Sequence, residues 1–254
     1  MLAHDILMGT MRPGRYVDHE WNVTKKDFSK AALRVCLCFP DVYEVAMSHL
    51  GIRILYDVMN AVKGVVCERA FCPWPDFGKV LSMNALALAS LESEVPLKSF
   101  DILGFSVNNE LNYSNILSML SLSGIPLRAA ERGPEFPLII AGGNCTLNPE
   151  PIAEFFDLFV IGEAEEVLLD MLTICTKFKR KYALLSKEKE ELLVALSQIP
   201  GIYVPCFYQV EYGSDHTVKE FIPLKKGIPA TIKKAWVRDL NKRGRLSSWI
   251  VPNI

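Results

Sequence analysis

Two apolar runs in the middle of the chain, each ending in glycine and followed by acidic residues, constrain the fold most. The first lies within Leu138–Pro151 and ends at Gly142-Gly143; the second lies within Phe155–Glu166 and ends at Gly162. In a parallel sheet, strands end in loops of this kind on the edge where ligands bind. The two runs therefore predict an α/β domain with a binding site at the carboxyl ends of its strands.

Apolar runs alternate with segments of helical periodicity along the first two thirds of the chain. Strands are predicted at 33–39, 65–71, 101–106, 138–142 and in the run before Gly162, with helices at 44–60, 76–84 and 110–122. Strands joined through helices need right-handed crossovers, which make the strands parallel. The predicted fold class is a doubly wound, Rossmann-like parallel sheet.

The pattern changes after about residue 180. A charged amphipathic helix is expected from Ser186, and three short alternating segments predict a small antiparallel piece, at 202–204, 207–212 and 218–222. We therefore divide the chain into an N-terminal extension (1–30), the doubly wound domain (31–180) and a small α+β C-terminal extension (181–254).

Composition limits the location and the partners. Half of the 254 residues are hydrophobic and 22% are charged, which suffices for an ordinary core. The net charge of −1 provides no general attraction to nucleic acid or membrane, although the stretch 225–245 is locally basic and leaves nucleic acid open as a partner. No apolar run reaches the roughly 18 residues of a membrane helix. Seven cysteines without a leader-like N-terminus lead us to expect reduced, mostly buried thiols in a cytoplasmic protein.

A set of short motifs carries a family resemblance. The motifs are Arg15-Tyr16, Glu20–Asn22, Phe39–Glu44, Met47–Gly51, Pro73–Asp76, Ser90–Ser93, Gly104–Ser106, Gly124–Arg132 and the two runs described first. From about Arg12 to Leu172 the chain resembles the N-terminal half of a radical SAM protein family with a cobalamin-binding-like domain. The resemblance implies a catalytic barrel in cis, whose CxxxCxxC loop binds a [4Fe-4S] cluster that cleaves S-adenosylmethionine.

This chain has no CxxxCxxC motif and ends where the resemblance places the start of the barrel. We therefore expect no catalytic residue, no metal ligand and no turnover in this chain alone. The substrate of the full protein stays unknown.

The resemblance also bears on cobalamin. Cobalamin domains that bind cobalt through histidine carry DxHxxG, SxL and Gly-Gly loops, and the matching positions here are Asp41–Ala46, Ser106–Asn108 and Gly142-Gly143. Tyr43 stands where the histidine would be, and a phenol that titrates near 10 is a poor substitute for imidazole. Two alternatives remain open: cobalamin binds without a protein ligand to cobalt, or the fold is retained as a structural domain that positions a macromolecular substrate. A nucleotide enzyme is a weaker third hypothesis, because the Gly-Gly loop lacks GxGxxG and GxxxxGK[ST].

The candidate cofactor-binding residues form a predicted cleft at the strand ends. They are Asp41, Tyr43, Ser48, Gly51, Ser106, Asn108, Gly142, Gly143, Asn144, Gly162 and Glu163. Structural roles compete with cofactor binding: tight turns for the glycines, helix capping for the polar residues, and a core anchor in place of a lid for Trp74. The cleft hypothesis further predicts that Gly143→Val weakens cobalamin binding without unfolding the domain.

Overall fold

The computed structural model describes residues 7–182, 188–239 and 250–251. These residues form a six-stranded sheet with the order β2-β1-β3-β4-β5-β6. The strands are β1 (Leu33–Phe39), β2 (Val65–Phe71), β3 (Ile102–Ser106), β4 (Leu138–Gly142), β5 (Leu158–Val160) and β6 (Ile202–Tyr203). Strands β1 to β5 are parallel, and β6 pairs with β5 in the antiparallel sense. The predicted doubly wound α/β fold is confirmed.

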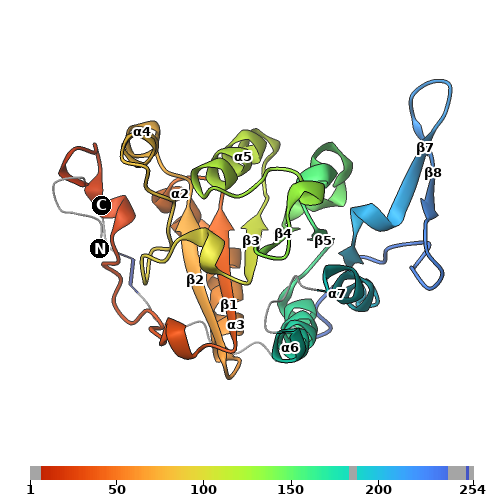
Figure 1. Ribbon diagram of the computed structural model, residues 1–254, viewed down its shortest axis with the longest axis horizontal. Helices are drawn as coiled ribbons and strands as arrows, with labels where there is room; N and C mark the ends of the chain where they lie inside the picture. Colours follow the sequence, from red (N-terminus) through yellow and green to blue (C-terminus); the bar gives the residue numbers. More distant parts are fainter. Residues whose placement is uncertain (1–6, 183–187, 240–249, 252–254) are drawn as a thin grey trace.

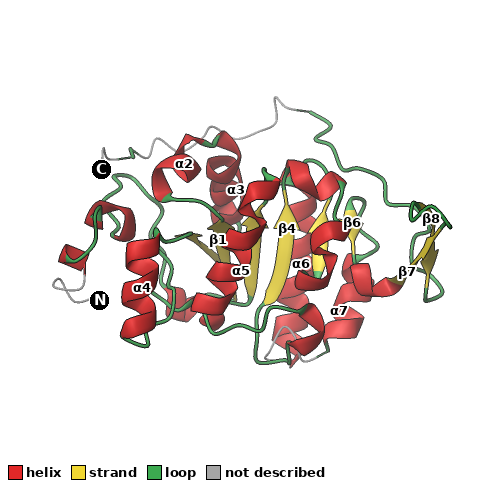
Figure 2. Cartoon of the chain, turned by 90° about the horizontal axis from the view of Figure 1, so that it is seen from above, coloured by secondary structure: helices red, strands yellow, loops and turns green. Residues whose placement is uncertain are grey.

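Helices cover both faces of the sheet, as Figure 2 shows. The helices are α2 (Tyr43–Ser48), α3 (Leu50–Ala61), α4 (Pro75–Met83), α5 (Tyr113–Leu122), α6 (Glu165–Tyr182) and α7 (Lys189–Leu196). Helices α4 and α5 pack together on one face, and α3 packs with α6 on the other. Within the described residues no helix has both the length and the apolar content to cross a membrane.

The continuous helix predicted at 44–60 is interrupted. His49 has an extended backbone (φ −85°, ψ 114°) and separates α2 from α3. Its ring lies 5.0 Å from the ring of Phe39, measured between centroids. A contact with the end of β1 thus accompanies the break, which helical periodicity alone could not predict.

Strand β2 carries charge into the interior although all seven of its residues are buried. The guanidinium of Arg69 donates to both carboxylate oxygens of Glu20, at 2.9 and 2.6 Å, and its Nε donates to Glu92 at 2.7 Å. The side chains of Arg69 and Glu20 are fully inaccessible to solvent. Residues before β1 therefore contribute to the same core as the sheet; the boundary predicted at residue 30 stays a prediction.

The C-terminal extension contains the predicted antiparallel piece, with one difference. Strands β7 (Tyr208–Tyr212) and β8 (Val218–Pro223) form a separate two-stranded sheet. Figure 1 shows this hairpin reaching out from the body of the molecule. The segment predicted at 202–204 instead joins the main sheet as β6. The sequence pattern showed a strand there but could not identify its partner, because pairing with β5 is a long-range contact.

Candidate functional site

The carboxyl ends of the parallel strands meet at one edge of the sheet. Strand β2 lies on one side of β1 and strands β3 to β5 lie on the other, so the chain direction across the sheet reverses between β1 and β3. In open α/β sheets, ligands bind outside this switch point. The loops after β1 and β3 are therefore where a site is expected.

Two asparagines from the β3 side hold these loops together. The Nδ2 groups of Asn112 and Asn115 both donate to the carbonyl oxygen of Pro40, at 2.8 and 2.9 Å. The same Asn112 nitrogen lies 3.5 Å from Oδ2 of Asp41. Protein groups thus bridge the switch point, and Asp41 lies beside this bridge.

The loops after β3 and β4 also lie against each other. Val107 N donates to Gly142 O at 2.6 Å, and Asn108 Nδ2 donates to Ser106 Oγ at 3.0 Å. The structure thus brings together Ser106, Asn108, Gly142 and Gly143, while the adjoining Asn144 is exposed. Whether these residues contact a cofactor stays a prediction.

Gly143 is required by the chain itself. Its backbone (φ 115°, ψ 179°) lies in a region that is essentially restricted to glycine. A Cβ atom there would lie 2.5 Å from Val107 O, whereas a Cβ on Gly142 would meet only Val160, at 3.9 Å. The expectation that Gly143→Val leaves the domain folded is therefore wrong, because the side chain would collide with backbone rather than enter an open cleft.

The chain covers its own β5 corner. Gly162 forms a parallel bridge with Ala235, and a Cβ on Gly162 would lie 2.1 Å from Ala235 O. Glu163 N donates to Ala235 O at 3.0 Å, and the Glu163 carboxylate accepts from Val237 N. Residues 235–237 thus occupy the place that the predicted cleft reserved for a ligand at Gly162 and Glu163.

Three further candidates lie apart from this edge contact. Tyr43 is buried and donates its hydroxyl to Glu20 Oε1 at 2.7 Å. Burial and then the Glu20 hydrogen bond raise the pKa of the phenol well above its usual value. Ser48 donates to Val45 O at 2.6 Å, and Gly51 is exposed on α3 with nothing near its Cβ direction. Tyr43 therefore belongs to the core network, and the cofactor contact assigned to Ser48 and Gly51 stays a prediction.

A groove that the sequence analysis did not identify opens between α4 and α5. It encloses about 630 Å³ and is lined by Asp41, Val42, Cys72–Pro75, Gly78, Lys79, Ser82, Met83, Asn115, Ser118 and Leu122. Of the predicted cofactor-binding residues, Asp41 is the one that lines it. Trp74 is 46% exposed, so the core-anchor role favoured from the sequence is wrong. The Pro73-Trp74-Pro75 segment was the signal in the sequence that could have revealed this groove, and the fold places the segment beside Asp41.

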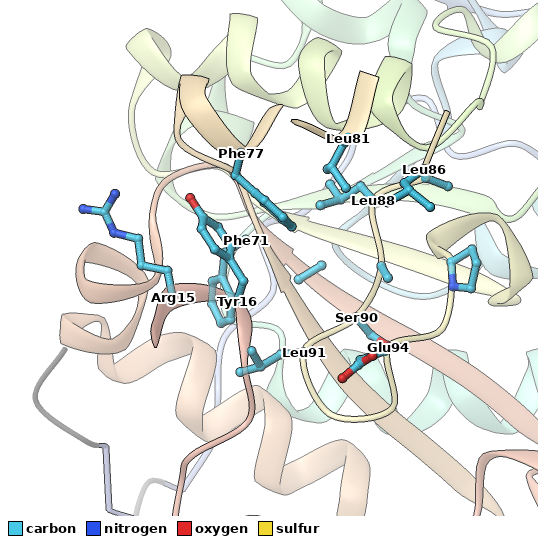
Figure 3. Close-up of a pocket in the computed structure, with 14 residues that line it drawn as sticks. Arg15, Tyr16, Phe71, Phe77, Leu81, Leu86, Leu88, Ser90, Leu91 and Glu94 are labelled. Carbon is cyan, nitrogen blue, oxygen red and sulfur yellow. The ribbon is translucent and has the colours of Figure 1, made fainter. Parts of the chain in front are cut away.

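A second cavity, of about 410 Å³, lies on the outer side of β2. Tyr16 and Phe77 stack on each other in its wall with ring centroids 3.9 Å apart, and leucines from 81–91 complete the wall. Figure 3 shows the guanidinium of Arg15 directed away from these rings. The lining is mainly apolar, so this cavity can hold an apolar group but presents little that could do chemistry.

The N-terminal turn is tied to the same edge by charge. Arg12 and Arg15 contact the Glu44 carboxylate at 2.9 and 2.6 Å. Arg15 also lies over the Trp74 ring at 5.3 Å from its centroid, and Tyr16 Oη accepts from Trp74 N at 3.2 Å. These contacts fix the wall of the groove that carries Trp74.

Glu44 should make the stability of this region depend on pH. Burial raises the pKa of its carboxyl group, the hydrogen bonds from Arg15 and Arg12 lower it, and the net pKa lies below its usual 4.5. A carboxylate with a lowered folded pKa adds stability above the unfolded pKa and loses it as pH falls through the folded value. We expect Glu44→Gln to lower the free energy of unfolding by up to about 1 kcal/mol at pH 7.

Urea denaturation of the wild type and Glu44→Gln at pH 7 and in steps below pH 4.5 measures this effect. The difference between the two proteins should shrink as the pH is lowered. An equal difference at every pH would contradict the role assigned to the carboxylate charge.

The cysteines behave as the sequence suggests. Cys36, Cys38, Cys67, Cys72, Cys145 and Cys175 are free and buried, and Cys206 is free and exposed. Burial raises the pKa of Cys175 to about 12, and burial together with Asp41 does the same for Cys72. Among the residues that the structure describes, no three His, Cys, Asp or Glu side chains lie close enough to hold a metal ion.

Comparison with known proteins adds a family to this geometry. A sequence model for the N-terminal region of radical SAM proteins matches residues 51–205. Uncharacterized protein MJ0966 of Methanocaldococcus jannaschii is 23% identical over 146 residues, which cover 56% of this chain and 27% of the relative. The chain thus corresponds to about a quarter of the length of that relative. No solved structure matches. Because the family match spans more than half of the residues, the chain belongs to the family of N-terminal regions of radical SAM proteins.

Proposed function

We propose that this chain is a positioning domain of a radical SAM enzyme that holds part of the substrate without binding cobalamin. The chemistry of the full protein would come from a [4Fe-4S] cluster that cleaves S-adenosylmethionine in a barrel outside this chain. The part of the chain that the structure describes brings together no set of ligands for such a cluster. Its own residues can bind and orient, and a radical would be generated elsewhere.

The strand ends do not fit cobalamin. A corrin ring with its nucleotide tail needs close approach to backbone at the Gly-Gly loop and at the neighbouring strand ends. Here the space next to Gly143 holds the Val107 carbonyl, and the space next to Gly162 holds Ala235. Asn112 closes the loop after β1 from the other side. These contacts support the non-cobalamin alternative, because the cofactor would have to displace backbone that is hydrogen-bonded within the protein.

The groove between α4 and α5 is the observation that carries the proposal. It lies at the ends of β1 and β2, beside the switch point, and has a volume typical of ligand sites. Trp74 offers an exposed aromatic face, Asp41 a carboxylate and Lys79 an exposed ammonium group. This combination can hold a planar or polar part of a substrate. The Cys72 thiol and Asp41 both line the groove, and burial together with Asp41 raises the pKa of that thiol, which favours a positioning role over a nucleophilic one.

One arrangement favours the cobalamin alternative. Ser106, Asn108 and Gly142 lie on adjacent strand ends, at the positions where cobalamin domains carry their SxL and Gly-Gly loops. Gly142 also has room beside it, since a Cβ would meet only Val160. The cobalamin-binding measurement therefore includes variants of Gly142.

Hydroxocobalamin binding tests the proposal. We expect neither this chain nor the full-length protein to retain colour through gel filtration after incubation with excess hydroxocobalamin. After anaerobic reconstitution, the full-length protein should contain about four irons, no cobalt, and should cleave S-adenosylmethionine. The full-length protein is included because the barrel could complete a pocket.

One equivalent of retained cobalamin that Gly142→Val abolishes would overturn the proposal and return Gly142 to a cofactor site. Gly142→Ala is the matched control, because its small side chain makes only an ordinary contact with Val160. Absence of iron and of S-adenosylmethionine cleavage in the full-length protein would separately contradict the radical SAM assignment of the whole enzyme.

A further inference from the structure

The β7–β8 hairpin is amphipathic. Its register places Tyr208 opposite Pro223, Val210 opposite Phe221, and Tyr212 opposite Val218 beyond an irregularity in the pairing. Directly opposed residues of an antiparallel pair lie on the same face, so these six apolar side chains form one surface, which we call the hairpin face. The opposite surface carries Gln209, Glu211, Glu220 and Ile222.

Among the residues that the structure describes, only the base of the hairpin face is covered. Tyr208 is 9% exposed, and its hydroxyl donates to Pro229 O at 2.7 Å. Toward the tip, Tyr212 is 60%, Val218 45% and Phe221 38% exposed. A lone two-stranded hairpin is marginally stable in water, and its apolar side chains are normally buried against another element. The tip therefore presents apolar surface that the described residues leave uncovered.

A cleft continues the hairpin face toward the body of the domain. It encloses about 540 Å³ between the hairpin, residues 230–232, and the ends of β5 and β6. Tyr203 lines its inner wall, 5.2 Å from Tyr208 between ring centroids, and donates its hydroxyl to Glu150 at 2.5 Å. The hairpin face and the cleft thus form one concave surface, which is large enough to receive part of another folded element.

We propose that this surface is where the catalytic barrel of the full-length protein docks. The inference rests on the proposed function, which places a barrel in the same polypeptide. The family describes the N-terminal region of larger proteins, and the matched relative has nearly three quarters of its length outside the match. A domain of that size in cis is present at high effective concentration, so a modest apolar contact suffices to hold it. Docking would also bury the open tip, which the hairpin needs for its own stability.

Hydrogen exchange measured by mass spectrometry tests the docking surface. Amides of 209–222 should exchange at least about tenfold more slowly in the full-length protein than in this chain alone. In full-length Tyr212→Ser/Phe221→Ser the exchange should return to the fast rate, while the core strands β1 and β3 stay protected. Full-length Gln209→Ser, on the opposite surface of the hairpin, is the matched control and should behave as wild type.

Equal exchange of 209–222 in both proteins would overturn the proposal. Slow exchange in this chain alone that depends on its concentration would also overturn it and would assign the surface to a second copy. A failure of docking can be distinguished from a failure of the proposed function, because iron content and S-adenosylmethionine cleavage report on the barrel whether or not it docks here.

Discussion

Replacing Arg69 by methionine should lower the free energy of unfolding by about 3–5 kcal/mol at pH 7. Arg69 makes hydrogen bonds with Glu20 and Glu92, and its guanidinium lies 4.8 Å from the centroid of the Tyr56 ring. Methionine fills much of the same volume but leaves two carboxylates buried without their cation. The cost is mainly the desolvation of those carboxylates, and not the loss of attraction alone.

The pH dependence identifies this cause. Burial already raises the pKa of Glu92 and Arg69 lowers it, so the loss of Arg69 should raise the folded pKa of Glu92 further above that of the unfolded chain. A group of this kind destabilises the fold as pH rises through the unfolded pKa, so the loss in Arg69→Met should be smaller near pH 5 than at pH 8. Guanidinium denaturation of the wild type and Arg69→Met at both pH values measures this difference in the free energy of unfolding.

Arg128→Met is the matched control, because Arg128 and Glu154 form an exposed pair with 58% and 54% of their side chains accessible. Its unfolding midpoint should equal that of the wild type. A loss in Arg69→Met as small as that of the control would show that the buried network does not hold residues 13–30 on the sheet.

Gly143→Ala should destabilise the fold by at least about 2 kcal/mol, and Gly142→Ala should have a far smaller effect. The two glycines are neighbours in the chain, yet the first alanine places a Cβ 2.5 Å from the Val107 oxygen and the second places it 3.9 Å from Val160. Gly143 also has a positive φ of 115°. Thermal and urea unfolding of both variants measures the difference.

Equal stability of the two variants would contradict the close approach of the β3 and β4 loops. It would also restore Gly143 as a candidate for ligand contact, as the sequence first suggested. The comparison thus separates a glycine that the fold needs from a glycine that a ligand needs.

The strands and their order of appearance were largely predictable. The bounds predicted for β1 and β2 agree with the structure, because both runs begin and end on apolar residues that are buried in the sheet. Parallel pairing followed from the helices between the strands, through the handedness of the crossovers. The edge that holds the carboxyl ends of the strands, and hence the general place of a site, came from the same argument.

The site itself was less predictable. Patterns of glycine and polar residues placed Asp41, Ser106, Gly142 and Gly162 at strand ends, which the structure confirms as positions. The sequence pattern did not show which residues each of these positions contacts. For Gly162 the neighbour is Ala235, from a segment whose sequence shows no clear periodicity, and this contact fills the corner expected to be open.

The amino-acid sequence by itself determined the local elements, the parallel sheet and the family, because these depend on periodicity, turn residues and motifs read within short windows. Only the tertiary structure decided that Glu20 meets Arg69, that β6 joins β5, and that the groove lies between α4 and α5 rather than over Gly143. Each of these depends on contacts between residues far apart in the chain. Such contacts form when side chains compete for the same interior volume and for hydrogen-bond partners, and no single window of the sequence records the outcome of that competition.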